Sequence, residues 1–320
     1  MTAKWQDVCQ EAHGEDYTIT IHYHGEEGVI SYVEVTVDPS VTVDGMTLRI
    51  PAALPTTRDA SQAPVIHVEV PDGFELRLEI PMDTLHYGNV VMRDCGDGTL
   101  EIQEHTVVWD YGVSLMVNTS GDLRVVENSI QFPDVTERNW AKDSVDYMSA
   151  RRYLIGKTNG TYGLTEEMDR KMVVLVLWRL AGSQEHHLEQ SPFPDITDPN
   201  SNYYDAILWA YEQGITTGKG DGTFRPDDKL TREQFATLIH RYAKMYECDL
   251  DQSVDADAKD FVDYDQIDPK MYESIQWILD TGLMNGHTDG SFEPDGTTPR
   301  EQMSTVFFRF LQAYFKSLEK

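Results

Sequence analysis

The chain has 320 residues, of which 40% are hydrophobic and 25% are charged. This composition is that of a globular protein with buried cores, and the length suits two or three domains. The 55 acidic residues outnumber the 26 basic ones, so the formal net charge is −29. Such a surface repels nucleic acid and anionic lipid, and we expect neither as a partner, although a local basic pocket would still admit an anionic ligand.

The cysteines and the apolar runs limit the class of protein further. Cys9, Cys95 and Cys248 are scattered, with neither metal-type spacing nor a disulfide framework. No apolar run reaches the ~18 residues of a membrane-spanning helix, so we expect no membrane span. Residues 1–15 are polar and acidic, unlike a signal peptide. If the protein is exported, this chain is a mature or trimmed form.

Residues 1–128 alternate apolar and polar side chains, as half-buried strands do. We predict a small antiparallel β domain, a sandwich or a rolled sheet, with hairpin turns at the four Asp-Gly or Ser-Gly pairs ending at Gly45, Gly73, Gly98 and Gly121. The predicted strands are 17–23, 32–37, 47–50, 65–70, 74–80, 100–104 and 114–117.

This β domain offers little chemistry. His22 and His24 share one face of a strand and could help to hold a metal, but exposed strand histidines are the simpler interpretation. Cys95, between Asp94 and Asp97, could be a nucleophile, but no local signature supports it, and a structural thiol is the better interpretation. Acidic turns could bind calcium weakly, although a solvated acidic face is simpler. We predict no catalytic residue, no metal site, and no enzyme.

Residues 129–320 repeat one pattern three times, over 129–183, 190–247 and 258–320. Each unit opens with a Phe-x-Asp element, continues through a helix to an Asn-Gly or Asp-Gly turn with an aromatic residue, and ends in a second helix. The repeated residues are Asp134, Asp195 and Asp263 at the openings, Tyr162, Phe224 and Phe292 at the turns, and Arg170, Arg232 and Arg300 at the second helices. A repeat array of helix-turn-helix units follows.

Apolar residues at helical spacing predict first helices at 143–154, 203–213 and 269–281, and second helices at 170–180, 232–245 and 300–318. Gly214 and Gly282 suit left-handed C-caps; Arg152 stands at that position in the first unit, so we expect that helix to end differently. Capping boxes are predicted for Thr231 with Gln234 and for Thr298 with Glu301.

Arg170, Arg232 and Arg300 lie in the first turn of a helix, where the helix dipole disfavours a cation by about 0.3–1 kcal/mol. Three arginines at one disfavoured position suggest a shared task. Free amides at a helix start together with a guanidinium would bind a carboxylate or a phosphate. Alternatively, each arginine pairs with a nearby aspartate, Asp134, Asp195 or Asp263, and ties the repeat together. Both interpretations stay open.

The three units resemble S-layer homology domains. The resemblance rests on Phe-Pro-Asp-Val at 132–135, Trp140, Gly-Asp-Gly-Thr-Phe-Arg-Pro at 220–226 and Thr-Arg-Glu-Gln at 231–234. It implies an all-α, pseudo-threefold trimer of repeats whose grooves bind secondary cell-wall polysaccharide of Gram-positive bacteria, often through pyruvylated N-acetylmannosamine.

The resemblance also assigns residues and a location. It implies that the arginine of the second helix, the Phe-x-Asp aspartate and the tryptophan are binding residues, here Arg170, Arg232, Arg300, Asp134, Asp195, Asp263 and Trp140. On this basis we expect a non-enzymatic protein of the bacterial cell wall or S-layer, and we expect Arg232→Ala to weaken wall binding without unfolding the repeats.

The first unit and the tryptophan position depart from the family pattern. Trp140 is matched by Asn202 and Lys270, and the first unit has Lys171-Met172 in place of the motif glutamate and Leu164 in place of the turn proline. The three grooves should therefore differ. A surface-associated hydrolase and a self-associating lattice subunit remain the alternatives.

Overall fold

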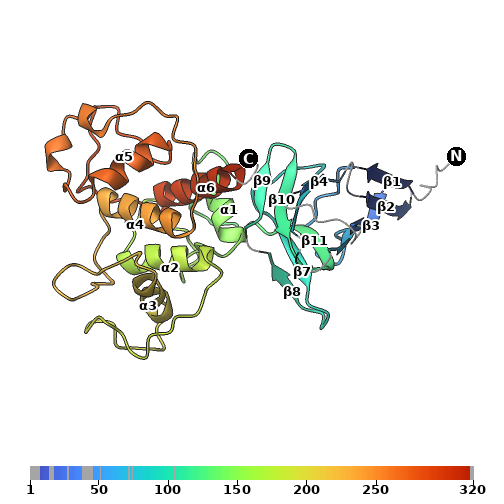
Figure 1. Cartoon of the computed structure of the whole chain (residues 1–320), viewed down its shortest axis with the longest axis horizontal. Helices are drawn as coiled ribbons and strands as arrows, with labels where there is room; N and C mark the ends of the chain where they lie inside the picture. Colours follow the sequence, from blue (N-terminus) through green and yellow to red (C-terminus); the bar gives the residue numbers. More distant parts are fainter. Residues whose placement is uncertain are drawn as a thin grey trace. The chain divides into compact units, whose positions relative to one another are not determined.

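The computed structural model describes the backbone of residues 8–13, 18–26, 29–37, 46–50, 52–70, 73, 75–103 and 105–317 (Figure 1). It describes the side chains of residues 33–35 and of these residues from 47 onward. The chain divides into two compact units. Unit 1 consists of residues 1–131 and 146–152, and unit 2 consists of residues 132–145 and 153–320.

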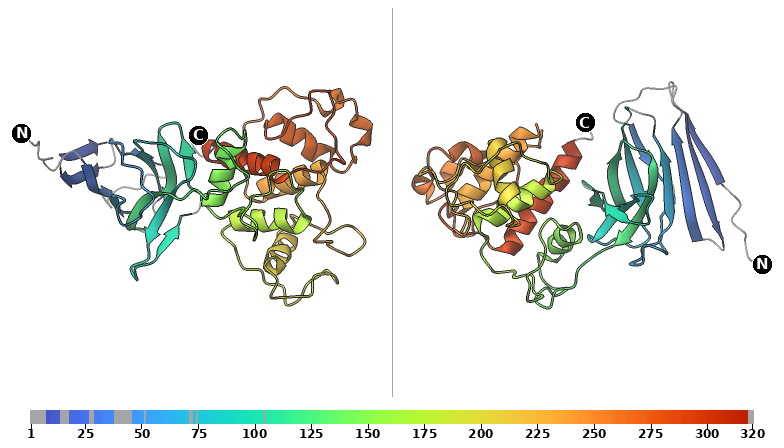
Figure 2. Two further views of the ribbon diagram at one scale, coloured as in Figure 1. Left: turned by 180° about the vertical axis from the view of Figure 1, so that it is seen from behind. Right: turned by 90° about the horizontal axis from the view of Figure 1, so that it is seen from below.

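Unit 1 contains two β-sheets (Figure 2). A seven-stranded sheet has the order β1-β2-β3-β5-β11-β7-β8, and a four-stranded sheet has the order β4-β6-β10-β9. Both contribute buried apolar side chains, such as Ile66 and Val91 in the first sheet and Leu78 and Leu115 in the second. The strands are β1 (Val8–His13), β2 (Thr18–Glu26), β3 (Val29–Val37), β4 (Met46–Arg49), β5 (Val65–Glu69), β6 (Leu76–Pro81), β7 (Asn89–Asp94), β8 (Leu100–Ile102), β9 (Val107–Trp109), β10 (Gly112–Val117) and β11 (Gly121–Glu127).

The prediction of a purely antiparallel domain is wrong, because β3 pairs with β5, and β4 with β6, in parallel. From β3 to β6 the chain alternates between the two sheets, so each parallel pair is joined by a long crossover that contains a strand of the other sheet. The prediction of a hairpin at Gly121 is also wrong, since its turn joins β10 of one sheet to β11 of the other.

Of the other predicted hairpin turns, that at Asp97-Gly98 is confirmed between the antiparallel strands β7 and β8. Gly98 has a φ of 88° there, a conformation that favours glycine. The predicted turns at Asp44-Gly45 and Asp72-Gly73 fall wholly or partly on residues outside the described set.

The second half of helix α1 (Lys142–Ala150) belongs to unit 1, although the helix is the first of the predicted repeats. Its Tyr147 donates a 2.7 Å hydrogen bond to the Thr106 carbonyl. Arg151, 5% exposed, donates through Nε to the Thr106 carbonyl at 3.1 Å and through Nη2 to the Asn89 carbonyl at 2.7 Å, and its guanidinium lies 3.7 Å from the Tyr147 ring centre. The domain boundary predicted near residue 128 thus differs from that of the compact unit, which also includes residues 146–152.

Unit 2 contains the remaining helices: α2 (Arg170–Leu180), α3 (Tyr204–Glu212), α4 (Arg232–Met245), α5 (Tyr272–Asp280) and α6 (Arg300–Ser317). The predicted bounds of α2 and α4 are confirmed to the residue. Gly214 and Gly282 are left-handed, with φ of 73° and 67°. Arg152 adopts the same conformation, with φ of 60°, so the expectation that the first helix ends differently is wrong.

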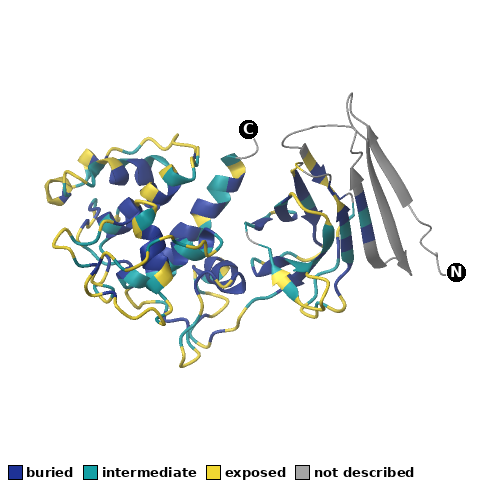
Figure 3. Cartoon of the chain, turned by 60° about the horizontal axis from the view of Figure 1, so that its bottom comes forward, coloured by how far each residue is buried: buried dark blue, intermediate teal, exposed yellow. Residues whose placement is uncertain are grey.

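The three second helices and the segments before them are linked in a cycle. Before α2, α4 and α6, short extended segments bridge Glu167 to Pro299, Asp169 to Lys229, and Thr231 to Thr297. The Phe235 ring of α4 packs on the Phe307 ring of α6, with centres 5.4 Å apart. Exposed residues gather in the loops of this unit (Figure 3). Within the described ranges, no helix is long and apolar enough to cross a membrane.

We predict that Arg151→Met lowers the free energy of unfolding by about 2–4 kcal/mol, because several buried carbonyls lose a charged donor at once. Arg152→Met is the matched control, since the neighbouring Arg152 is exposed, and should change stability by less than about 0.5 kcal/mol. Urea unfolding followed by far-UV circular dichroism measures both. Equal stability of the two variants would contradict the bracing role of Arg151.

Candidate functional site

The three Phe-x-Asp aspartates hold the turns of their own repeats. Each carboxylate accepts two backbone N–H groups at 2.7–3.0 Å. The donors are Tyr162 and Gly163 for Asp134, Phe224 and Arg225 for Asp195, and Phe292 and Glu293 for Asp263. Burial raises the pKa of Asp134, but the amide donors outweigh it and leave that pKa lowered. In the structure, each of these carboxylates fixes the turn of its own repeat.

The three arginines reach across to the turn of another repeat. Their Nε atoms donate to the carbonyl of the turn aromatic at 2.7–2.9 Å, and each guanidinium lies 4.8–4.9 Å from the centre of the same ring. The pairs are Arg170 with Phe224, Arg232 with Phe292, and Arg300 with Tyr162. The first repeat therefore holds the second, the second holds the third, and the third holds the first.

The expected free amides at the helix starts are already occupied. The first amide of α2 donates to the Asp228 carbonyl at 3.0 Å, and the second to the Pro226 carbonyl at 3.1 Å. The corresponding amides of α4 and α6 donate to carbonyls of the segments 294–296 and 164–166. The prediction of an anion site built from free helix amides is therefore wrong.

An ion pair between the arginine and the aspartate of one repeat was the alternative interpretation. In the structure, the arginine of one repeat instead binds the turn of the next repeat. The arginine and the aspartate of the next repeat both bind the backbone of one turn: the Phe292 carbonyl accepts from Arg232, and the Phe292 amide donates to Asp263. Burial lowers the pKa of the Arg232 guanidinium, and the nearby carboxylates of Glu293 and Asp263 oppose this. The charge persists, because arginine stays protonated in proteins.

The guanidinium nitrogen Nη1 has a different environment in each repeat, and at Arg170 Nη2 has no hydrogen-bond acceptor among the described residues. At Arg300 it faces two thioethers, with Met168 Sδ at 3.7 Å and Met172 Sδ at 3.9 Å. At Arg170 it donates a 3.5 Å hydrogen bond to Gln234 Oε1. Arg232 uses Nε and Nη2, the latter toward the Asn285 carbonyl at 2.9 Å, and within the described part of the chain its Nη1 has no hydrogen-bond acceptor.

Arg232 borders a pocket of about 210 Å³ in unit 2, which we call the Arg232 groove. Of the predicted site residues, it brings together Arg232 and Trp140, whose side chain is 61% exposed. The other lining residues come from the loop before the third turn, from the residue two positions before α6 and from the first half of α6: Leu283, Met284, Asn285, Gly286, His287, Thr298, Gln302, Thr305, Val306 and Arg309. No acidic residue is among them, in contrast to the net charge of the chain.

Thr298, at the wall of this groove, is 1% exposed, and its hydroxyl has no partner among the described residues. Its predicted capping box is therefore wrong: α6 begins at Arg300, and Thr298 caps nothing. The equivalent box at Thr231 forms in part, since its hydroxyl accepts from the Gln234 amide at 3.4 Å. Sequence reasoning missed Thr298 as a site residue, because it read the residue as a cap.

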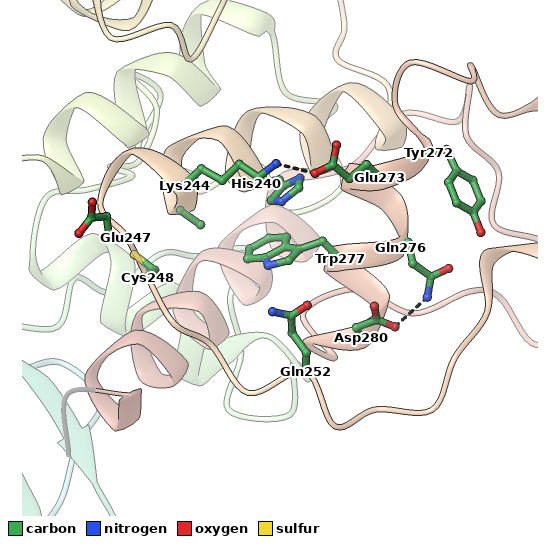
Figure 4. A pocket seen from close by; sticks show the side chains of 11 residues that line it. His240, Lys244, Glu247, Cys248, Gln252, Tyr272, Glu273, Gln276, Trp277 and Asp280 are labelled. Atoms are coloured by element: carbon green, nitrogen blue, oxygen red, sulfur yellow. Dashed lines mark hydrogen bonds and ion pairs between the residues drawn. The ribbon is translucent and has the colours of Figure 1, made fainter. Parts of the chain in front are cut away.

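A larger pocket of about 640 Å³ lies between α4, α5 and the linker that follows α4 (Figure 4). Three carboxylates line it, from Glu247, Glu273 and Asp280. Its polar groups largely satisfy one another, since Lys244 donates to Glu273 at 2.5 Å and Gln276 to Asp280 at 2.7 Å. Burial raises the pKa of the lining Cys248 thiol to about 12, so it is a poor nucleophile. This pocket is the less suitable place for an anionic ligand.

The predicted metal and nucleophile candidates of unit 1 gain no support. His22 and His24 lie on β2, but their side chains are outside the described set. Cys95 is a free, exposed thiol whose sulfur lies 4.0 Å from the Arg93 carbonyl oxygen. Among the described side chains, no group of three or more His, Cys, Asp or Glu residues is placed to hold a metal ion.

Comparison with known proteins identifies two of the repeats. The family model of the S-layer homology domain matches residues 192–236 and 260–304. The first predicted repeat is outside these ranges and remains a prediction.

Curated relatives match parts of the chain. An endoglucanase of Bacillus sp. is 30% identical over 185 residues, which are 58% of this chain and 19% of that protein. An S-layer protein of Bacillus licheniformis is 32% identical over 108 residues, 34% of this chain and 12% of that protein. A cellulosome-anchoring protein of Acetivibrio thermocellus is 24% identical over 164 residues, 50% of this chain and 35% of that protein. The chain thus spans about a third or less of each.

We predict that Arg232→Ala destabilises the protein by about 2–4 kcal/mol, because two backbone carbonyls lose a charged donor and the Phe292 ring loses its stacking partner. The expectation that Arg232→Ala weakens wall binding without unfolding the repeats stays a prediction, and we expect this loss of stability to accompany it. Urea unfolding tests it, with the exposed Arg138→Ala as control. An unchanged midpoint for Arg232→Ala would show that the brace contributes nothing.

The buried His240 should make stability depend on pH. Its ring stacks on Trp277 with centres 4.7 Å apart, and burial lowers its pKa to about 4 from an ordinary value of 6.5. The folded protein therefore favours the neutral imidazole, and the associated stability is present above about pH 6.5 and is lost as the pH falls toward 4.

We predict that the difference in thermal midpoint between pH 7 and pH 4.5 is smaller for His240→Gln than for the wild type. His187→Gln is the control, since the side chain of His187 is 85% exposed. Parallel pH profiles of the wild type and His240→Gln would contradict the assignment.

Proposed function

We propose that this chain, which carries S-layer homology domains at residues 192–236 and 260–304, is a non-enzymatic cell-surface protein that binds wall polysaccharide through its repeat unit. The Arg232 groove is the observation that carries the proposal. It combines a buried cation, one nitrogen of which has no acceptor among the residues that the structure describes, with an exposed indole and a lining without carboxylates.

This combination suits an acidic polysaccharide. A guanidinium recognises a carboxylate by charge-assisted hydrogen bonds. The exposed face of Trp140 offers an apolar surface to the C–H face of a sugar ring, and a few placed polar groups around such a surface are typical of ligand sites. In a chain with a net charge of −29, a groove free of carboxylates is the place where an anion meets least repulsion.

The ligand we propose is a pyruvylated secondary cell-wall polysaccharide of a Gram-positive-type bacterium. A pyruvyl group carries a carboxylate, and its negative charge fits the open nitrogen of Arg232. The cellulosome-anchoring relative is named for anchoring, and the S-layer relative for the surface layer; both support a location at the cell surface. Unit 1 would then be a spacer or an adhesion module.

We attribute no catalysis to this chain. The endoglucanase to which this chain is similar is named for its action on glucan, but the chain covers only 19% of that protein. A shared wall-binding module accounts for the likeness between enzymes and surface-layer proteins, because function resides in sites rather than in the whole fold.

We predict that the full chain co-sediments with purified Gram-positive cell walls and that mild-acid removal of their pyruvyl groups abolishes this binding. Free pyruvylated N-acetylmannosamine glycoside should compete, and the same glycoside without pyruvate should not. Binding that persists on depyruvylated walls would transfer the site to another wall component. Failure to bind any wall of suitable source would overturn the anchoring function.

A further inference from the structure

We propose that one face of helix α5 is a docking site for a partner polypeptide, and that the pocket on this face receives an arginine side chain of that partner. The pocket is the one of about 640 Å³ between α4, α5 and the linker that follows α4, and we call it the α5 pocket (Figure 4). It shares no lining residue with the Arg232 groove, so the proposal is independent of wall binding.

The first helices of the repeats carry this face at corresponding positions. In α3 and α5 the face consists of the same residue types in the same order, an aromatic residue, an acid, a tryptophan and an acid. They are Tyr204, Asp205, Trp209 and Glu212 in α3, and Tyr272, Glu273, Trp277 and Asp280 in α5. In α1, Tyr147 stands at the position of the tryptophan. The three helices can therefore be compared by what covers this face.

The face of α1 is covered by the β-sheets of unit 1. Tyr147 is fully buried and donates its 2.7 Å hydrogen bond to the Thr106 carbonyl, which lies just before β9. Another part of the chain itself thus covers the first of the three faces.

The face of α3 is covered by the linker that follows α2. His186 of this linker packs edge-on against the Tyr204 ring with centres 6.4 Å apart, and its Nε2 lies 3.5 Å from a carboxylate oxygen of Asp205. The backbone amide of the next residue, His187, donates to the Glu212 carboxylate at 3.1 Å. A planar, basic side chain on a polypeptide segment therefore occupies this face once within the molecule.

The corresponding face of α5 is open. The linker before α5 is held to the helix by Gln276, which accepts from the Ala258 amide at 3.0 Å and donates to the Ala256 carbonyl at 2.6 Å. The linker leaves the α5 pocket beside it, and Trp277 is 9% exposed where Trp209 of α3 is 0% exposed. The volume lies within the range of about 300–1,000 Å³ that is typical of ligand pockets.

Two polar side chains of the pocket have bonding capacity to spare. Among the described side chains, the exposed carboxylate of Glu247 has neither an ion pair nor a hydrogen bond. His240 is 5% exposed and its Nδ1 lies 3.0 Å from Ser274 Oγ, whereas its Nε2 has no partner in the described part of the chain. With the Nδ1 proton on the Ser274 side, Nε2 accepts from an N–H group. This nearly buried ring with an open nitrogen is an independent sign of an occupant.

The charge of the lining favours a cation. Three carboxylates, from Glu247, Glu273 and Asp280, stand against the ammonium group of Lys244. Lys244 pairs with Glu273, but the two side chains are 59% and 76% exposed, and surface ion pairs of this kind contribute little to stability. An incoming cation can therefore share Glu273. The His240 ring does not repel it near pH 7, because burial lowers the pKa of this histidine to about 4.

An arginine side chain fits these features. Its guanidinium is planar, as is the imidazole on α3, and its fork of N–H donors suits carboxylates and aromatic neighbours such as Trp277. Polypeptide covers the other two faces, which favours a polypeptide here. Val254, whose amide donates to the Asp280 carbonyl at 3.1 Å, is 43% exposed and offers an apolar contact to residues beside the arginine.

The test is a titration of the full chain, labelled with ¹⁵N in its six tryptophan indoles, followed by NMR. The probes are N-acetyl-arginine methylamide and the citrulline analogue, which has nearly the same shape but no charge. We expect the arginine probe to shift the Trp277 signal, assigned through Trp277→Phe, and to leave the Trp140 and Trp209 signals in place. The citrulline probe should bind at least about tenfold more weakly, because it makes no charge-assisted bonds.

Matched variants locate the carboxylates. Glu247→Gln should weaken the arginine probe about fivefold or more and leave the thermal midpoint unchanged, because this side chain has no partner among the described residues. Asp249→Asn is the control, since this exposed acid of the same linker does not line the pocket. Asp280→Asn should also weaken binding, whereas Glu212→Gln, its equivalent on the covered face of α3, should stay within twofold of the wild type.

A longer probe tests for a polypeptide. The amidated tripeptide N-acetyl-Leu-Arg-Leu should bind at least threefold more tightly than the single residue, and Val254→Ser should remove that gain. A tripeptide that binds no more tightly would overturn polypeptide docking in favour of a small cation.

Other results would overturn the arginine site itself. These are equal affinity for the arginine and citrulline probes, no shift of the Trp277 signal, or equal losses in Glu247→Gln and Asp249→Asn, which would indicate general attraction by an acidic surface. None of these results depends on whether the chain binds cell walls.

Discussion

The hydrogen bond from each arginine Nε to a turn carbonyl of another repeat is the interaction on which the repeat unit depends. The second helix begins at the arginine, the turn it reaches is held by that repeat's own aspartate, and the aromatic side chain of that turn stacks on the guanidinium. Taken three times, the contact closes a cycle. This closure explains why a cation occupies a helix start, where the dipole disfavours it by about 0.3–1 kcal/mol. One charge-assisted bond to a backbone carbonyl at Arg170, and two at Arg232 and Arg300, outweigh that cost.

Local sequence signals made the repeat helices predictable. The sheets of unit 1 were harder to predict, because their strands pair with partners that are distant in the sequence. The bounds of α2 and α4 follow from one apolar face and an N-cap residue. In unit 1, β7 buries Val90 and Val91 in succession, so it lacks the alternation that reveals a strand. The parallel pairing of β3 with β5 depends on which sheet the intervening β4 joins, and no local pattern encodes that. Arg152 shows that a left-handed helix end need not be glycine when the surrounding structure fixes it.

The candidate site was predictable only as far as the motif residues. Arg232 and Trp140 stand in recognisable positions, and the structure places them in one groove. The residues that distinguish the grooves do not belong to the motif of the same repeat. Met168 and Met172 of the first repeat contact Arg300 of the third through their sulfur atoms. Gln234 of the second repeat accepts a hydrogen bond from Arg170 of the first. These contacts cannot be predicted from the sequence of a single repeat, because each of them joins residues of two different repeats.

The nitrogens of one guanidinium thus differ in their surroundings. Nε binds a turn carbonyl in all three repeats, and at Arg232 and Arg300 Nη2 binds a second carbonyl, so these nitrogens are fixed by the fold. Nη1 lies outside that brace, and its neighbours range from thioethers to an amide to none among the described residues. The helices and turns can therefore keep the same brace while the residues around it differ. The arginines brace the fold in every repeat, and the neighbours of their remaining nitrogens differ from one repeat to the next.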